Sequence, residues 1–302
     1  MQAAGGTGAL DAGGMPAAEI ARAKVNLALH VAGQRGDGYH LLDSLVVFPD
    51  IGDVVSISRD GSGLTVAGPY EHALPCSGRG DNLVMKAARL LAEAAGRDSG
   101  EISLTLEKIL PVASGIGGGS ADAAAALRLL RRVWALDISD SALLQLALKL
   151  GADVPMCLLS VPARVSGIGE IIDPVRTMPA CGIVLVNPGV EVPTPEVFQA
   201  LRRRDNQPLP DVPAAGFQEF DDLIGWLHGT RNDLAEAAMD VAPGIAEVLS
   251  MLDAQGEVAF ARMSGSGATC FALTWDVAKA EALSARIAVS RPHWWATAGR
   301  IT

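Results

Sequence analysis

The sequence predicts a globular protein in which strands and helices are mixed, with a domain boundary near residue 175. The chain has 302 residues, enough for one large domain or two ordinary ones. Stretches with the two-residue period of a strand alternate with stretches of helical period. Beyond Pro174 the composition changes, and a charged, Pro-rich stretch intervenes at residues 202–213. We therefore expect a first domain over residues 19–175 and a second over residues 176–302.

The first 18 residues are rich in Ala and Gly and contain no basic residue. They lack the charged start of a secretory signal, so residues 1–18 are interpreted as a disordered tail outside the fold. No apolar run approaches the roughly 18 residues that a membrane helix needs. The four cysteines form no C-x-x-C pair and the histidines are scattered, which argues against a zinc site and favours idle thiols in a reducing cytoplasm.

Composition and charge limit the possible functions. Hydrophobic residues make up 49% of the chain and charged residues 19%, as in globular rather than disordered proteins. The net charge of -10 repels polyanions, so nucleic-acid binding is not expected as the main role. An enzyme that uses ATP can still be acidic, because backbone amides and a divalent cation bind the phosphates locally.

The first predicted domain begins with strand-like stretches at residues 20–31, 45–48 and 54–57, separated by Gly and Asp turns. Asp81 or Asn82 is placed to cap a helix with apolar positions over residues 83–94. Residues 102–107 alternate between apolar and polar, as in a half-buried strand. A helix from Ser120 and another over residues 140–150, capped by Ser139 or Asp140 and ended by Gly151, complete this domain.

The second predicted domain contains a short apolar strand over residues 183–186. Helical patterns follow at residues 234–239 and 245–252. A second glycine loop over residues 264–267 then leads into a buried strand over residues 268–273.

A strand, a glycine-rich loop and a helix follow one another around residues 114–120, which read Ser-Gly-Ile-Gly-Gly-Gly-Ser. Glycines let consecutive amides converge, and the start of the next helix adds a partial positive charge, so this order is typical of an anion site. A P-loop needs Lys-Ser/Thr after the last glycine, where Ser120-Ala121 stands. A dinucleotide fingerprint starting at Gly115 has Ser120 in place of its third glycine, although Asp137 could be its acid. The loop by itself leaves a phosphate site, a dinucleotide site and a turn without ligand open.

Other residues that could carry chemistry lie far from this loop in the sequence. Lys24 and Asn26 lie on the expected first strand, and Tyr39-His40 follow a glycine-containing loop. Asp153 follows a helix and precedes Val154-Pro155. Each has an ordinary structural explanation when taken alone, such as a solvated strand lysine or a turn aspartate. Only their combination is informative.

Taken in order, these motifs resemble those of the GHMP kinase superfamily over residues 21–271. The matching stretches are 23–27, 33–40, 81–83, 108–111, 115–124, 150–155, 167–170, 188–198, 231–234 and 263–267. The Gly-Tyr-His and Pro-Thr-Pro elements distinguish the chain from mevalonate or homoserine kinases. Departures are small: Ala113-Ser114 stands where the superfamily usually carries more glycine, Ala121 replaces a frequent serine, and Ser266 replaces a common threonine.

The resemblance implies an α+β protein with the two-domain GHMP kinase fold and an active site in the interdomain cleft. It implies an ATP-dependent kinase that phosphorylates the 2-hydroxyl of a cytidyl diphosphate alcohol in non-mevalonate isoprenoid precursor biosynthesis. The expected partners are this small-molecule substrate and ATP, with Mg²⁺ bridging the phosphates, and the expected state is a cytoplasmic monomer or weak homodimer. Another GHMP small-alcohol kinase, a dinucleotide-dependent oxidoreductase and a catalytically silent binding protein remain as alternatives.

The resemblance also assigns residues by matching motif. Asp153 would be the catalytic carboxylate and Lys24 its cationic neighbour. The ATP-binding set would be Gly115, Ile116, Gly117, Gly118, Gly119, Ser120, Asn82, Leu83 and Lys108. The substrate-binding set would be Asn26, Tyr39, His40, Asp153, Thr194 and Phe198, with Tyr39 and Phe198 enclosing the cytosine and His40 hydrogen-bonding its edge. No acidic metal cage is visible in the sequence, which suits a magnesium ion held largely by phosphate and water.

Overall fold

A computed structural model describes residues 17–58, 63–74, 82–98 and 102–301. These residues form two compact units, each assembled from separate parts of the chain. The first contains the segments up to Arg22, Gly52–Val112 and Gly118–Leu159. The second contains Ala23–Ile51, Ala113–Gly117 and Ser160–Thr302. Within the described residues, no helix is long and apolar enough to cross a membrane.

The first unit is a sheet covered by helices. Its strands lie in the order β1-β4-β6-β5. β1 (Ala18–Arg22) and β6 (Ser103–Glu107) are both antiparallel to β4 (Gly52–Ile57), while β5 (Gly63–Ala67) is parallel to β6. The alternation expected over residues 102–107 is confirmed: the buried positions are Ile102, Leu104 and Leu106, and the others are not buried.

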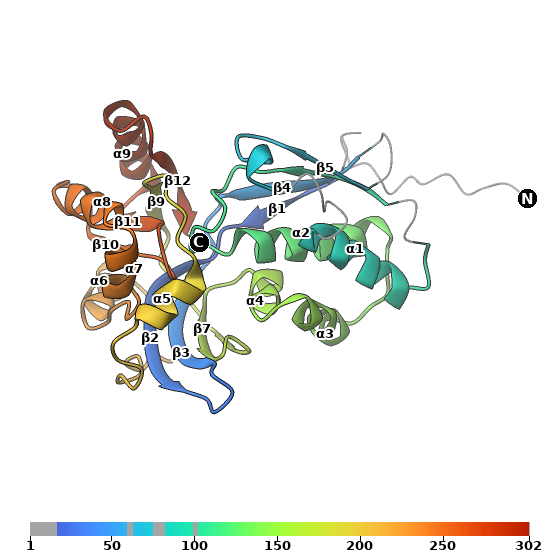
Figure 1. Ribbon diagram of the computed structural model, residues 1–302, viewed down its shortest axis with the longest axis horizontal. Helices are drawn as coiled ribbons and strands as arrows, with labels where there is room; N and C mark the ends of the chain where they lie inside the picture. The colour runs from blue at the N-terminus through green and yellow to red at the C-terminus, as the bar shows by residue number, and fades with distance from the viewer. Residues whose placement is uncertain (1–16, 59–62, 75–81, 99–101, 302) are drawn as a thin grey trace, which may run out of the picture. The chain divides into compact units, whose positions relative to one another are not determined.

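Four helices follow in this unit: α1 (Leu83–Ala94), α2 (Gly118–Val133), α3 (Asp140–Leu150) and α4 (Val154–Leu159). A short 3-10 turn spans Glu71–Ala73. In Figure 1, α1 and α2 lie along one face of the sheet. The side chains of α2 from residue 121 to 127 are all buried, and most are alanines, so neighbouring elements can approach this helix closely on several sides.

Two helix caps agree with the sequence. The Asn82 side chain accepts from the Val84 amide at the start of α1, and Ser139 accepts from the Ala142 amide at the start of α3. Gly151 follows the last residue of α3, as expected. Asp81, the other candidate cap of α1, lies outside the described residues, as do residues 1–16 of the expected tail.

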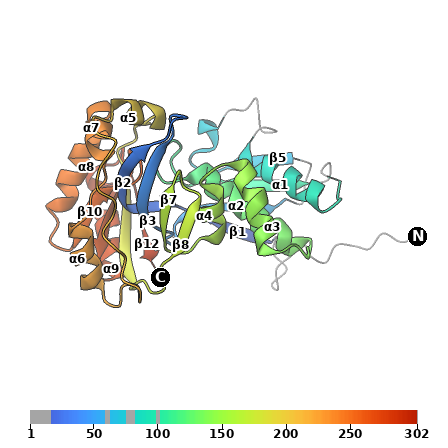
Figure 2. The ribbon, with the colours of Figure 1, turned by 90° about the horizontal axis from the view of Figure 1, so that it is seen from below.

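The second unit contains two antiparallel sheets. One has the order β2-β3-β7-β8, from Val25–Gln34, His40–Val47, Ala163–Gly167 and Ile171–Pro174, which lie side by side in Figure 2. The other has the order β10-β11-β9-β12, from Phe260–Met263, Cys270–Thr274, Cys181–Asn187 and Trp295–Ile301. Every residue of β9 is buried, which explains the apolar run over residues 183–186.

Five helices complete the second unit: α5 (Thr194–Ala200), α6 (Phe220–His228), α7 (Ala235–Val241), α8 (Gly244–Asp253) and α9 (Val277–Ser290). One apolar core joins β9 and β11 to α5, α7, α8 and α9, and it includes Leu29 and Val31 of β2. β2 therefore packs into this core. Its second residue is Asn26, which is expected to bind the substrate.

Two expectations about the chain's organisation require correction. The single strand expected over residues 20–31 is two strands in different sheets, because Arg22 pairs with Gly52 of β4 whereas Val25 pairs with Val47 of β3. The boundary expected at residue 175 also differs from the structure, which assigns residues 23–51, 113–117 and 160–175 to the second unit. Local sequence patterns report conformation, and they do not report which distant strand is the partner.

Candidate active site

The glycine-rich loop has one half in each unit. Residues up to Gly117 belong to the second unit, while Gly118, Gly119 and Ser120 are the first residues of α2 in the first unit. Gly115 and Gly117 have φ values of 75° and 66°, a region that L-residues avoid. The amides of the first turn of α2 have no intrahelical acceptor, and Gly118, Gly119 and Ser120 are at least partly exposed. This helix start can therefore bind an anion.

The loop preceding α2 packs against the second glycine loop, residues 264–267, which connects β10 to β11. The Ser264 hydroxyl accepts from the backbone N–H of Asn26 (3.0 Å) and donates to the Gly115 carbonyl (3.2 Å). A Cβ on Gly115 would lie 2.7 Å from the carbonyl oxygens of both Ser264 and Gly267, and one on Gly265 would lie 2.6 Å from the Gly115 oxygen. Glycine is required at both positions because the two backbones touch. The second loop supports the first.

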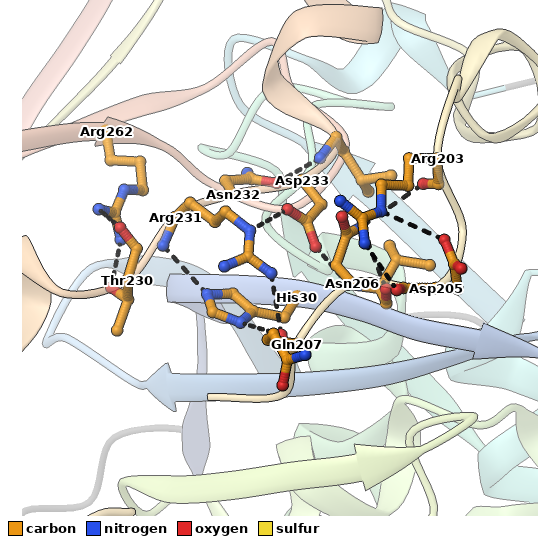
Figure 3. A network of polar contacts seen from close by, with 12 residues as sticks. His30, Arg203, Asp205, Asn206, Gln207, Thr230, Arg231, Asn232, Asp233 and Arg262 are labelled. Carbon is orange, nitrogen blue, oxygen red and sulfur yellow. Dashed lines mark hydrogen bonds and ion pairs between the residues drawn. The ribbon is translucent and has the colours of Figure 1, made fainter. Parts of the chain in front are cut away.

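Asn232 also stabilises the second glycine loop. Its side-chain amide donates to the carbonyls of Met263 (2.8 Å) and Gly265 (2.9 Å). The Arg231–Asp233 segment is in turn fixed to β2, because Asp233 accepts from the Val31 amide and His30 accepts from the Arg231 amide. Figure 3 shows this network around His30. Burial lowers the pKa of His30, so its ring is neutral and Nε2 can accept this hydrogen bond.

Lys24 lies at the break between β1 and β2 and not on a strand. Its amide donates to the Ile116 carbonyl (2.9 Å), and its side chain runs beside Gly117, where a Cβ would lie 3.2 Å from Lys24 Cβ. Ile116 is fully buried, so its side chain anchors the loop. The second unit thus brings Lys24 to the glycine loop. Asp153 belongs to the first unit, where it directly precedes α4.

Five residues expected to bind the acceptor substrate, Asn26, Tyr39, His40, Thr194 and Phe198, all belong to the second unit. The rings of His40 and Phe198 stack with their centroids 4.7 Å apart. Tyr39 is 61% exposed. The Thr194 hydroxyl is hydrogen-bonded to Ser266 of the second glycine loop (2.7 Å).

Two buried polar atoms of this set have no hydrogen-bond partner among the described residues: Asn26 Oδ1 and His40 Nε2. The side-chain nitrogen of Asn26, Nδ2, donates to the Ser44 hydroxyl (2.7 Å), and this hydrogen bond fixes the direction of Asn26 Oδ1. Burial and the charge of Arg204 lower the pKa of His40, so its ring is neutral at pH 7. An unsatisfied buried polar atom costs about 1–3 kcal/mol, and a ligand that supplies the missing partner recovers that cost.

Of the residues expected on the adenine side, Leu83 lies beside the start of α2, since a Cβ on Gly119 would contact it at 3.8 Å, and Asn82 precedes Leu83 as the N-cap of α1. Lys108, the third residue expected on this side, is held by two carboxyl groups. It is only 2% exposed, and its ammonium donates to Asp53 and, at 2.9 Å, to Asp122. Sequence patterns missed both aspartates, although each is an acidic residue on the buried face of a strand or helix, which is a detectable signal.

Residues 82–160 match the GHMP kinases N terminal domain, and residues 209–289 match the GHMP kinases C terminal model. A curated 4-diphosphocytidyl-2-C-methyl-D-erythritol kinase of Paracoccus denitrificans is 52% identical over 280 residues, which are 93% of this chain and 95% of the relative. The chain belongs to this family of GHMP kinases. A relative of the same name from Mesorhizobium japonicum is 51% identical, over 93% of this chain and 94% of its own.

Solved structures agree with the GHMP kinase assignment. A crystal structure of 4-(cytidine 5'-diphospho)-2C-methyl-D-erythritol kinase matches with a TM-score of 0.76 and 34% identity, over 94% of this chain and 98% of that one. A homoserine kinase from Cytophaga hutchinsonii matches with a TM-score of 0.63 at 18% identity, over 95% of each chain, which shows the shared fold alone. The resemblance read from the motifs is confirmed: the chain is a kinase with the GHMP fold. The oxidoreductase and the mevalonate or homoserine kinase alternatives are not favoured.

Proposed function

We propose that this kinase transfers the γ-phosphoryl group of ATP to the 2-hydroxyl of 4-diphosphocytidyl-2-C-methyl-D-erythritol. The products are ADP and the 2-phosphate, in the non-mevalonate route to isoprenoid precursors. The observation that carries the proposal is the 52% identity to a curated enzyme of this name over 93% of the chain. The geometry of each unit supports it.

The first unit supports phosphate binding. The free amides and partial positive charge at the start of α2 attract the ATP phosphates. Leu83, which lies beside this helix start, and the preceding Asn82 would border the nucleotide. The described residues contain no cluster of three or more His, Cys, Asp or Glu side chains that could hold a metal ion. Magnesium would therefore be bound mainly by phosphate oxygens and water, where it neutralises negative charge.

The second unit supports recognition of a cytidyl group. The neutral His40 ring can present Nε2 as an acceptor to the cytosine amino group or, as its other tautomer, as a donor to a ring atom. Phe198, stacked on His40, offers an aromatic surface beside that contact, and the exposed Tyr39 ring is available for a second stack. The free Asn26 oxygen would accept from a substrate hydroxyl. A site that depends on such hydrogen bonds discriminates strongly against analogues without them.

Asp153 and Lys24 carry the proposed chemistry. Phosphoryl transfer runs through a loose transition state, so positioning and charge stabilisation contribute more than proton abstraction. Asp153 would orient the 2-hydroxyl and accept its proton as the new P–O bond forms. Lys24, held beside the glycine loop by its backbone, would stabilise the charge on the transferred phosphoryl group.

The test is a comparison of acceptor alcohols. Purified protein with ATP and Mg²⁺ is given the cytidyl substrate, mevalonate or homoserine, and ADP release is followed while phosphorus NMR identifies the product. We expect turnover with the cytidyl substrate only, and a phosphomonoester on its 2-position. ADP release with mevalonate or homoserine, and none with the cytidyl substrate, would refute the assignment.

A further inference from the structure

A buried ion cluster lies under the start of α2 in the first unit. It consists of Lys108, which directly follows β6, Asp53 of β4 and Asp122, the fifth residue of α2. Each of the three is at most 2% exposed. A Cβ on Gly118, the first residue of α2, would lie 3.0 Å from the Lys108 ammonium nitrogen. The ammonium thus contacts the beginning of the helix directly.

The same cluster also holds the chain before the glycine loop. One carboxylate oxygen of Asp53 accepts from the amides of Ile109 (2.5 Å) and Leu110 (2.7 Å), while the other accepts from Lys108. Lys108 in turn donates to Asp122 (2.9 Å). Asp53 and Lys108 therefore connect the segment that enters the loop with the helix that leaves it. The segment before the loop and the helix after it are thus linked by the hydrogen bonds of three buried side chains, Asp53, Lys108 and Asp122.

Fold stability does not explain this cluster well. Burying an ammonium with two carboxyl groups costs desolvation energy, and apolar side chains of similar volume often stabilise a fold as much or more. Hydrogen bonds in a fixed geometry can, however, hold backbone segments in one relative position, which apolar contacts do less specifically. The feature held in position here is the helix start at Gly118.

We propose that Asp53 and Asp122, acting through Lys108, are positioning residues for ATP. They hold the start of α2 so that its free amides point at the phosphates. This inference rests on the proposed function, because it takes the start of α2 as the phosphate site. It gives Lys108 the task of fixing the loop in place of the nucleotide contact that the resemblance implies.

The experiment uses the full chain and three variants: Lys108→Met, Asp122→Leu and the double variant. The dissociation constant of Mg-ATP is measured by calorimetry, the KM of the cytidyl substrate by turnover, and the unfolding midpoint by circular dichroism. We expect each single variant to weaken ATP binding about tenfold while the KM of the cytidyl substrate stays within about twofold. The double variant should bind ATP no more weakly than Lys108→Met, because both single changes break the same connection.

The matched control is Glu19→Gln. Glu19 binds Arg128 and Arg132 in the second half of α2, away from the glycine loop. This change also removes ion pairs from α2, so it reports any effect that comes only from a less stable helix. We expect it to leave ATP binding unchanged, and an equal weakening by Glu19→Gln would overturn the proposal.

The sign of the Asp122→Leu effect separates positioning from direct contact. If Lys108 binds the nucleotide itself, removing Asp122 releases its ammonium, and ATP binding stays the same or tightens; that result would overturn the proposal. If Lys108→Met does not fold, the double variant carries the test, since an apolar pair often replaces buried ions without loss of stability. Normal ATP binding by the variants of an active kinase refutes this inference alone. Weakened ATP binding in a protein that does not use the cytidyl substrate refutes only the substrate assignment.

Discussion

Raising the pH from 7 to 9 should remove a proton from Asp122 in the folded protein. Burial raises the pKa of Asp122 to about 8, although Lys108 opposes the rise, and the neighbouring Asp53 carboxylate adds to it. The geometry explains the direction: one ammonium serves two carboxyl groups, Asp53 has two further amide donors, and Asp122 Oδ1 has no partner among the described residues. At neutral pH we therefore expect Lys108 to be positively charged, Asp53 to be negatively charged and Asp122 to be protonated.

This proton links stability to pH. In the unfolded chain Asp122 ionises near its ordinary pKa of about 3.9, so between pH 4 and 8 only the folded state binds the proton. Its contribution to stability is fully present below the unfolded pKa and is lost as the pH rises through 8. With a folded pKa of about 8, the change from pH 7 to pH 9 should lower the free energy of unfolding by about 1 kcal/mol. For a chain of this size that is a fall of about 2 °C in Tm.

The assay is thermal unfolding between pH 6 and 9, for the wild type and for Asp122→Asn. Asparagine has nearly the same shape and cannot ionise, so the variant should lose this part of the pH dependence. Burial also raises the pKa of Cys181, to about 12, whereas thiols of the unfolded chain have an ordinary pKa of about 8.5 and ionise within this range. This effect lowers the stability of both proteins equally, so the difference between their Tm curves isolates Asp122. Parallel decreases in the Tm of wild type and Asp122→Asn between pH 7 and 9 would refute the reasoning.

Three further variants test the site. Asp153→Asn should lower kcat by about 100-fold or more with nucleotide binding retained, and near-normal turnover would remove Asp153 from its proposed role. His40→Ala should lower kcat/KM for the cytidyl substrate by about tenfold without changing the KM for ATP, as expected for the loss of one hydrogen bond; an unchanged kcat/KM contradicts the cytosine contact. Gly115→Ala should destabilise the protein by more than about 2 kcal/mol in denaturant unfolding, because its Cβ would lie 2.7 Å from two carbonyl oxygens at a φ of 75°. Gly36→Ala, whose Cβ would meet nothing within 4 Å, is the control and should change stability by less than about 0.5 kcal/mol; equal losses would contradict the role of the close backbone contact.

The sequence predicts local structure well where a single side chain decides it. Asn82 and Ser139 cap helices as their positions indicate, because an N-cap hydrogen bond spans only two or three residues. The alternation of residues 102–107 identifies β6 by the same local reasoning. The break between β1 and β2 was missed, because nothing in residues 20–31 shows that Arg22 pairs with Gly52 while Val25 pairs with Val47.

For the candidate site, motif resemblance supplied the residue types, and the structure supplied their surroundings. It places Lys24 beside Gly117 and stacks His40 on Phe198. The roles assigned to these residues in catalysis and binding stay predictions, which the variants above would test. The supporting contacts of Asn232 with the second glycine loop were not predictable, since Asn232 lies 31 residues from Met263 and 33 from Gly265 in the sequence.

The glycine-rich loop shows most clearly which features follow from the sequence and which follow from the tertiary structure. Its composition and the helix that follows it made this segment a candidate anion site from the sequence alone, because glycine conformations and the amides of a helix start are local properties. Tertiary structure alone decided what holds the loop in place: Ser264 and Gly267 against Gly115 in the second unit, and Lys108 between two aspartates in the first. Such contacts join residues that are far apart in sequence, and neither periodicity nor propensity carries information about them.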